Sequence, residues 1–301
     1  MSFQPRFSYT HSMVRNLGLI ESARAVVEVL PLPPDRVLWL RQAARQRATR
    51  NSTRIEGNTL NSTEVGQAVV AVGRTQTEMQ QEVRNYWRAL EWIEEQLDVR
   101  RSLSEEFVCE LHCIVLVRGH GRRATRSAYR TGECPVVDAA TRRIDYGPPK
   151  PADVPRLMQE LVEWWQGSAA DALPGPVRAG LVAHRFVSIH PFGDGNGRTA
   201  RALATTELWR AGYDMRGFLS LEEHYTANLQ AYYNSLQMGL PVDFYEGRHD
   251  PDHTQWLDKW RDDGFVQPAK PGAQRVRNYL LTETWTKLIE DALRSARPKK
   301  P

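Results

Sequence analysis

The sequence predicts an all-α protein that carries one small β-hairpin. Apolar residues recur every three or four positions along most of the chain, a spacing that is typical of amphipathic helices. The interval 129–149 instead holds short β-prone runs on either side of residues 138–141, which predicts a hairpin. The chain has 301 residues, of which 41% are hydrophobic and 25% charged, as is ordinary for a globular protein.

Helices are predicted throughout the N-terminal part of the chain. The first keeps an apolar face as far as Leu30 and is broken by the prolines in residues 31–34. A second is expected over about 35–50. Asn61 with Glu64 has the pattern of a capping box, which predicts the start of a third helix.

Further amphipathic helices follow on both sides of the predicted hairpin. One has Val83 and Leu97 on its apolar face, and the next has Phe107 and Ile114. After the hairpin, helices are expected from about Val154, over 176–189, over 199–211 and over 224–238.

The chain contains three cysteines, Cys109, Cys113 and Cys134. So few cysteines, in an odd number, indicate a reducing compartment, and we expect a cytoplasmic protein. Cys109 and Cys113 could face one metal ion together with His112, but no second group of ligands follows at the spacing of a zinc site. Buried thiols are therefore the preferred interpretation.

The sequence gives no sign of membrane insertion, and a solvated surface is preferred over a basic face that binds DNA. The N-terminus lacks the apolar core of a signal peptide, and no apolar run is long enough to cross a bilayer. The formal net charge is only +4, and the arginines are dispersed. The oligomeric state stays open, a homodimer included.

The residues with the clearest chemistry lie between His190 and Arg201. A predicted helix ends at the histidine, a loop with three glycines follows, and a new helix begins. Free N–H groups at a helix start bind anions, and Arg198 and Arg201 could clamp phosphate oxygens from the first helical turn. Asp194 offers a ligand for Mg²⁺, and His190 offers a base. Together they are the groups needed for phosphoryl or nucleotidyl transfer.

This stretch resembles the signature of the Fic family. It matches H-x-F-x-[DE]-G-N-G-R-x-x-R at every fixed position, and the similarity extends from about Ser12 to Asp262. Residues 129–132 resemble the entry to the flap of that family, and residues 148–149 resemble its exit. The resemblance implies a Fic-type helical bundle and a protein adenylyltransferase, which moves AMP from ATP onto a hydroxyl of a target protein.

The resemblance also implies a role for each residue of the loop. His190 would take the proton from the attacking hydroxyl, and Asp194 would hold Mg²⁺ against the phosphates. Gly195, Asn196 and Gly197 would form the anion hole.

The phosphates of ATP would also contact the helix that follows the loop. The resemblance implies that Arg198 binds the β-phosphate and Arg201 the γ-phosphate, while Phe192 is buried and fixes the loop. Tyr232 and Tyr233 are candidates for the adenine pocket, although a place in the helix core is an equally good interpretation.

The flap is expected to bind the target protein. By resemblance, Cys134, Pro135 and Val136 would align an extended target segment by strand addition. The insert over 138–142 is longer than in the usual form of the family, so the flap contacts stay open.

A second motif precedes the Fic region. Ser52, Glu56 and Gly57 match the inhibitory pattern [ST]-x-x-x-E-[GN] of the family, in the position of its N-terminal inhibitory helix. In that subclass the glutamate pairs with the second arginine of the signature, here Arg201. Such a pair would occupy the place of the γ-phosphate and misalign the α-phosphate.

The resemblance divides the chain into three regions. These are 1–100, helical, with the inhibitory helix around 52–57; 101–262, the Fic core with flap 129–149 and catalytic loop 190–201; and 263–301, a linker and a C-terminal helix over about 275–297 of unknown role.

Other functions on the same fold stay open. They are removal of AMP with Glu56 orienting a water molecule, and Doc-like phosphate transfer, which the intact G-N-G-R sequence disfavours. A nucleotide-binding regulator without enzyme activity would not need His190. A DNA-binding regulator is a further alternative, but the tail is short for a winged helix.

Overall fold

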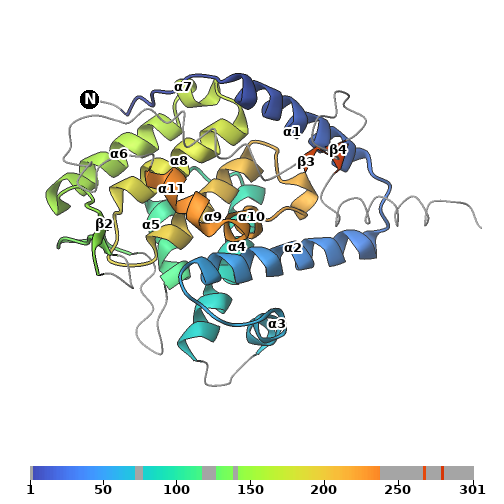
Figure 1. The fold of residues 1–301 in the computed structure, drawn as a ribbon, viewed down its shortest axis with the longest axis horizontal. Helices are drawn as coiled ribbons and strands as arrows, with labels where there is room; N and C mark the ends of the chain where they lie inside the picture. The colour runs from blue at the N-terminus through green and yellow to red at the C-terminus, as the bar shows by residue number, and fades with distance from the viewer. Residues whose placement is uncertain are drawn as a thin grey trace, which may run out of the picture.

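A computed structural model describes residues 3–71, 77–116, 127–137 and 142–237, together with the backbone of 267–268 and 279–280. Within these ranges the chain is mostly helical, which confirms the predicted all-α fold class (Figure 1). The helices are α1 His11–Val29, α2 Pro34–Ile55, α3 Ser62–Val70, α4 Glu78–Asp98, α5 Glu105–Leu116, α6 Val154–Trp165, α7 Ser168–Asp171, α8 Gly175–Ile189, α9 Asn196–Arg210, α10 Leu221–Ala227 and α11 Leu229–Gln237, with short 3-10 turns η1 Pro151–Asp153 and η2 Met215–Gly217. The strands are β1 Val136–Val137, β2 Ile144–Tyr146, β3 Gln267–Pro268 and β4 Tyr279–Leu280.

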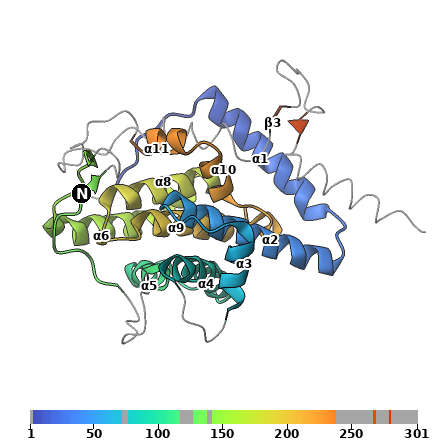
Figure 2. The same cartoon turned by 60° about the horizontal axis from the view of Figure 1, so that its bottom comes forward.

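Helices α8 and α9 pack against each other at the centre of the fold. Figure 2 shows α4 and α5 on one side of them and α10 and α11 on the other. Every residue of α8 from Gly175 to Phe186 is buried, as expected for a helix that is covered on all sides. The start of α9 is therefore held rigidly at the end of α8.

Helix α2 continues five residues beyond the predicted end at Arg50, to Ile55. Ser52 and Thr53 favour caps and turns over helix interiors, which is why the prediction ended too early. In the structure both are buried in the last turn of α2, so tertiary contacts extend the helix. This extension carries the chain to Glu56, which is the residue that ends α2.

The predicted capping box opens α3. The side chain of Asn61 accepts hydrogen bonds from the N–H groups of Thr63 and Glu64, and Glu64 accepts one from the N–H of Asn61. The reciprocal bonds satisfy N–H groups that a helix start leaves without partners.

The predicted hairpin is present as β1 and β2. The two strands are antiparallel, and Val136 pairs with Tyr146 and Val137 with Ile144. The connecting residues 138–141 lie outside the described part of the chain. Strands β3 and β4 form a second antiparallel pair, which was not predicted because two-residue strands leave no periodic signal.

The expected C-terminal helix over 275–297 is described only at Tyr279 and Leu280. These two residues form β4, so the prediction of helix is wrong there. The other residues of that helix lie outside the described ranges.

The helix expected over 224–238 is two helices. The chain leaves helical geometry at Asn228, where φ is −143° and ψ is 75°, and Met238 lies outside the described residues. The side chain of Asn228 accepts a hydrogen bond from the N–H of Ala231, so a local bond competes with continued helix. The break separates α10 from α11 and lets α11 lie beside the end of α2.

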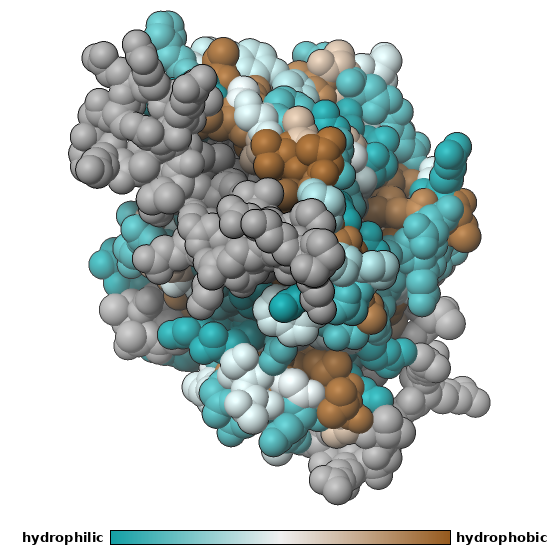
Figure 3. Space-filling view, turned by 90° about the vertical axis from the view of Figure 1, so that its right-hand side faces the viewer, coloured by the Kyte–Doolittle hydropathy of each residue, from teal (hydrophilic) through white to brown (hydrophobic). Residues whose placement is uncertain are grey.

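The surface is mainly hydrophilic at the end where α1 leads into α2 (Figure 3). Isolated apolar side chains are exposed in this region, among them Val29, Leu38 and Trp39. Scattered residues of this kind are common on protein surfaces. Among the residues that the structure describes, no helix combines the length and apolar character needed to span a bilayer.

Candidate active site

The chain turns sharply between α8 and α9. His190 ends α8 with a left-handed backbone, φ 51° and ψ 57°, and Gly195 precedes α9 with φ 73°. A side chain at Gly195 would also collide with Leu116, so glycine is required there for both reasons. The tight turn explains why α9 starts at Asn196, three residues before the predicted start at Thr199.

Asn196 closes the loop between the two helices. Its side-chain amide donates to the carbonyl of Phe192 at 2.8 Å and accepts from the N–H of Phe192 at 3.0 Å. Phe192 is 1% exposed, which agrees with the expected anchoring role, and stacks on His112 with ring centroids 3.6 Å apart. The loop is thus fixed by packing and by its own hydrogen bonds.

His112 is a part of the site that the sequence did not reveal. Its Nε2 lies 2.7 Å from the carbonyl oxygen of Asp194, and its Nδ1 lies 2.6 Å from the hydroxyl of Ser127. A carbonyl can only accept, so Nε2 carries the proton and Nδ1 accepts from Ser127. Burial lowers the pKa of His112 to about 4, and the neutral ring holds the loop in place. Cys109 and Cys113, on the same helix, are buried thiols outside any disulfide, as preferred from the sequence.

The imidazole of His190 is oriented by the end of α8. Its Nδ1 donates to the carbonyl of Val187 at 3.3 Å, which leaves the lone pair on Nε2. Burial lowers the pKa of His190, while the bond to Val187 opposes this effect. The ring is therefore neutral at pH 7 and can accept a proton at Nε2.

The start of α9 can bind an anion. No side chain caps its first turn, so N–H groups at Asn196, Gly197 and Arg198 are available. The guanidinium of Arg198 is 4% exposed and lies 3.3 Å from Glu82 and 3.5 Å from Asp194. Its buried Nε has no partner among the described residues, which fits a ligand that supplies acceptor oxygens.

Asp194 lies at the rim of this anion site. Its Oδ1 accepts from the N–H of Gly195 at 2.6 Å, and its side chain is 44% exposed. An accessible carboxylate beside an anion site has the chemistry of a ligand for a divalent cation shared with phosphates.

The second arginine contacts the end of α2. Nη2 of Arg201 donates to Oε1 of Glu56 at 2.7 Å, although 145 residues separate them. Ser52 accepts from Nε of Arg201 through its hydroxyl and from Nη2 through its carbonyl, both at 2.9 Å. A side chain at Gly197 would collide with Oε1 of Glu56, so the carboxylate lies directly on the anion loop. The pairing of Glu56 with Arg201 expected from the motif is present.

The two tyrosines of α11 border the same contact. Tyr232 is 6% exposed, stacks on Tyr225 at 4.6 Å, and has its hydroxyl 3.5 Å from Nη1 of Arg201. Tyr233 is 44% exposed, and its hydroxyl donates to the carbonyl of Ile55 at 3.1 Å. Tyr232 is thus part of the core beside Arg201, and Tyr233 is the exposed one of the two tyrosines.

Arg130 ties the flap to the loop. Its Nε donates to the carbonyl of His190 at 2.8 Å, and its other nitrogens donate to the carbonyls of Gly132 and Pro149. Its N–H also donates to the carbonyl of Pro191 at 2.9 Å. One side chain therefore joins the entry and the exit of the flap to the base of the loop.

The flap lies over the loop at Cys134. The thiol of Cys134 is 3.5 Å from the carbonyl of Gly193, while Pro135 and Val136 are exposed. Of the three expected flap residues, Cys134 contacts the loop, while Pro135 and Val136 are exposed beside it in sequence.

Glu82 and Asn58 were also missed from the sequence. Glu82 contacts Arg198, and its other oxygen accepts from the side chain of Asn58 at 3.0 Å. Asn58 is two residues beyond Glu56, so a single chain of contacts joins both arginines to the end of α2. Neither residue has a local sequence signal, because the contacts form only on folding.

Comparison with known proteins connects this site to one family. The profile of the Fic/DOC family matches residues 102–208, which include the flap and the loop but not Glu56. The Protein adenylyltransferase Fic of Drosophila willistoni is 28% identical over 202 residues, 66% of this chain and 39% of that protein. The chain therefore spans well under half the length of this curated relative.

Solved structures show the same fold. A Fic domain containing signaling protein from Bacteroides thetaiotaomicron has a TM-score of 0.66 at 24% identity, covering 81% of this chain and 90% of that one. A Fic family protein from Desulfovibrio desulfuricans has a TM-score of 0.69 at 21% identity, covering 99% of this chain and 79% of that one.

Proposed function

Because residues 102–208 form a Fic/DOC family domain, we propose that this chain transfers AMP from ATP to a hydroxyl group of a target protein. The main support is the position of His190, a neutral base at the mouth of an anion site that includes two arginines. The relative from Drosophila willistoni, which carries the name Protein adenylyltransferase Fic, adds to it.

His190 acts as general base in this proposal. Its Nε2 takes the proton of the target hydroxyl while the hydroxyl oxygen attacks the α-phosphorus of ATP. A bond forms between these two atoms, and the bond from the α-phosphorus to the bridging oxygen breaks. Pyrophosphate leaves with the electron pair. The tautomer set by Val187 keeps Nε2 ready for the proton.

The anion site binds the β- and γ-phosphates, which leave as pyrophosphate. The N–H groups of Asn196 and Gly197 would donate to phosphate oxygens, and that of Gly195 would do so only on leaving Asp194. Arg198 and Arg201 would bind the β- and γ-phosphates. The Nε of Arg198 is buried without a hydrogen-bond partner among the described residues, which supports the assignment of Arg198 to a phosphate. Asp194 would hold Mg²⁺, which would neutralise charge on the phosphates when bound.

Glu56 restrains the reaction in the same proposal. Its carboxylate accepts a hydrogen bond from Nη2 of Arg201 and lies against Gly197. It therefore fills the place of the γ-phosphate and uses the guanidinium that would bind this phosphate. ATP that binds beside Glu56 has its α-phosphate displaced from the line of attack. A displacement of about 1 Å can slow such a reaction about 100-fold.

The flap presents the target. The exposed residues Pro135 and Val136 lead into β1, and an extended target segment can bind along this strand. Arg130 then fixes the distance between the bound segment and His190. Tyr233 is the candidate that contacts adenine, since its ring is accessible.

Labelled ATP distinguishes this activity from phosphate transfer. The Glu56→Gly variant is incubated with Mg²⁺ and ATP labelled at the α- or the γ-phosphate, with cell lysate as the source of targets. AMP transfer leaves label on protein from α-labelled ATP alone. Label from γ-labelled ATP alone would indicate a kinase-like reaction and would reject the proposal. The variant Glu56→Gly with His190→Ala controls for contaminating transferases.

Removal of AMP is a second candidate function. The carboxylate of Glu56 lies against Gly197, in the same loop that His190 begins, and its charge opposes the lowering of the His190 pKa by burial. In this case wild-type protein strips AMP from a modified target, and Glu56→Gly does not.

A further inference from the structure

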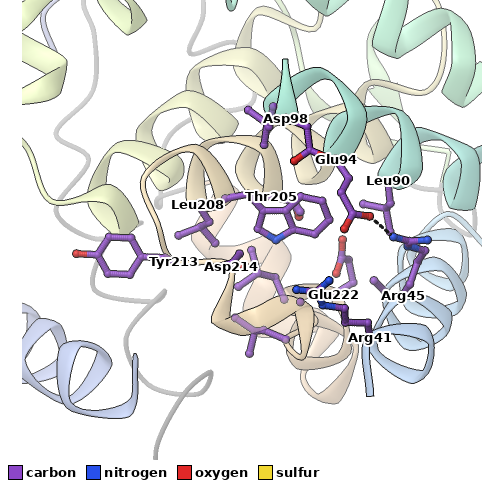
Figure 4. A pocket seen from close by; sticks show the side chains of 16 residues that line it. Arg41, Arg45, Leu90, Glu94, Asp98, Thr205, Leu208, Tyr213, Asp214 and Glu222 are labelled. Atoms are coloured by element: carbon purple, nitrogen blue, oxygen red, sulfur yellow. Dashed lines mark hydrogen bonds and ion pairs between the residues drawn. The ribbon is translucent and has the colours of Figure 1, made fainter. Parts of the chain in front are cut away.

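A cavity of about 330 Å³ lies at the opposite end of α9 from the anion site. Residues of α2, α4, α9 and α10 line it, and Figure 4 shows it from close by. Thr205 and Leu208 of α9 line the cavity. Thr205 is one helical turn beyond Arg201, on the same face of α9. The cavity is therefore separate from the proposed nucleotide site but next to its second arginine.

The lining of this cavity is acidic. It contains more carboxylates than guanidinium groups, namely Glu94, Asp98, Asp214 and Glu222 against Arg41 and Arg45. Arg45 is already bonded to Glu94 and to Glu91, and the ion pair with Glu94 is drawn in Figure 4. The balance of charge thus favours a cation over an anion.

A polar group in the wall has no partner. Thr205 is 9% exposed, and its hydroxyl forms no hydrogen bond to any residue that the structure describes. Its oxygen is not one of the fully buried unpartnered atoms, so it is accessible from the cavity that Thr205 lines, and hydroxyl groups inside proteins are usually hydrogen-bonded. Because Thr205 is one of the lining residues labelled in Figure 4, a molecule inside the cavity could supply a partner for its hydroxyl.

Glu222 is the buried carboxylate of the cavity. It is 1% exposed and accepts hydrogen bonds from the hydroxyls of Tyr86 at 2.7 Å and Ser220 at 3.2 Å. Its own backbone N–H is a third donor, and since a carboxylate has about four acceptor sites, capacity for one further donor remains. Burial raises the pKa of Glu222, and a cationic group in the cavity would favour its ionised form.

We propose that this cavity binds a small organic cation, an amine with an apolar body. The ammonium group donates to Glu222 and to the hydroxyl oxygen of Thr205. Leu90, Leu97, Leu208 and Leu219 provide apolar walls for the remainder of the molecule. The proposal does not depend on the transfer activity.

The ligand would lie at one end of a buried chain of hydrogen bonds. The hydroxyl of Tyr86 donates to Glu222 and accepts from the hydroxyl of Ser52, whose oxygen accepts from Nε of Arg201. The site therefore contacts the residues that hold the second arginine of the anion site.

Binding of phenethylamine tests the proposal by calorimetry on the full chain. We expect phenethylamine to bind at least about tenfold more tightly than phenylacetate or 2-phenylethanol, which have the same ring but a negative or no charge. Binding should persist in saturating ATP and Mg²⁺, because the two sites are separate.

Variants locate the bound amine. Thr205→Val keeps the shape of the side chain but removes the hydroxyl, and Asp98→Asn removes an exposed charge, so both should fold. We expect each to weaken binding several-fold and Glu222→Gln to weaken it at least about tenfold. Glu95→Gln, an exposed residue of α4 outside the lining, is the matched control and should bind as wild type does.

Three results would overturn the proposal. The first is binding of phenylacetate as tight as that of phenethylamine. The second is wild-type affinity in both Thr205→Val and Asp98→Asn. The third is loss of amine binding in saturating ATP, which would place the amine in the nucleotide site.

Discussion

Ser52 holds the guanidinium of Arg201 through two separate hydrogen bonds. Its hydroxyl accepts from Nε and its carbonyl accepts from Nη2, each at 2.9 Å, while Glu56 is a further partner of Nη2 at 2.7 Å. The position of Arg201 therefore depends mainly on Ser52. Glu56 uses binding capacity that the arginine can offer to a phosphate instead.

Because Ser52 positions Arg201 and Glu56 only adds a further contact, substitutions of Ser52 and Glu56 should differ in their effects on stability. Ser52→Ala leaves Nε of Arg201 buried without an acceptor and should lower the free energy of unfolding by about 1–3 kcal/mol. Glu56→Gly should change it less, since the side chain is 30% exposed and the bonds to Ser52 remain. Urea unfolding of both variants checks this. A Ser52→Ala variant as stable as wild type would contradict it.

His190→Ala should abolish transfer and leave the affinity for ATP nearly unchanged. In the proposed mechanism the base acts only on the attacking hydroxyl, whereas α9 and its arginines bind the phosphates. Calorimetry with ATP and Mg²⁺ measures binding, and α-labelled ATP measures transfer, both in the Glu56→Gly background. Transfer by the His190→Ala variant at a near-normal rate would show that His190 is not the general base.

The same assignment predicts a pH dependence. Burial lowers the pKa of His190 below the ordinary value of 6.5, so the ring stays neutral in more acidic solution than a free histidine does. The rate of transfer should therefore fall on the acid side with a midpoint below pH 6.5. A midpoint above that value would show that burial does not control the base.

Asp194→Ala should remove the effect of Mg²⁺ on ATP binding. Asp194 is the one carboxylate within the loop, and it lies at the rim of the anion site. Calorimetric titration of ATP with and without Mg²⁺ compares the variant with wild type. An unchanged response to Mg²⁺ would mean that the ion is held elsewhere.

His112 should make the fold less stable in acid. The pKa is about 4 in the folded protein and 6.5 in the unfolded chain, so the unfolded chain binds more protons between these values. Stability then falls as the pH drops from 7 to 5, by about 2 kcal/mol for this residue. His184 has the same shift, so the comparison of wild type with His112→Gln isolates the share of His112. Equal pH dependence in both proteins would contradict the account.

The fold and the central loop were predictable because their signals are local. Helical periodicity gave the helices, and the residues from His190 to Arg201 lie within one contiguous stretch. The contact of Glu56 with Arg201 was expected only because both motifs belong to one family pattern. Proximity of residues 145 positions apart has no local signature.

The features that were missed depend on tertiary contacts. His112 and Glu82 are ordinary helix residues in the sequence, and only packing brings them to Asp194 and Arg198. The true end of α2 was missed because Ser52 and Thr53 disfavour helix until burial outweighs propensity.

The central claim is that Glu56 restrains AMP transfer by occupying Arg201. The most direct measurement is the rate at which label from α-labelled ATP appears on protein, for wild type and for Glu56→Gly at equal concentration. Since the variant frees Arg201 for the γ-phosphate, we predict a rate increase of the order of 100-fold, with ATP bound at least as tightly. Equal rates for the two proteins, across several nucleotides and lysates, would contradict the account.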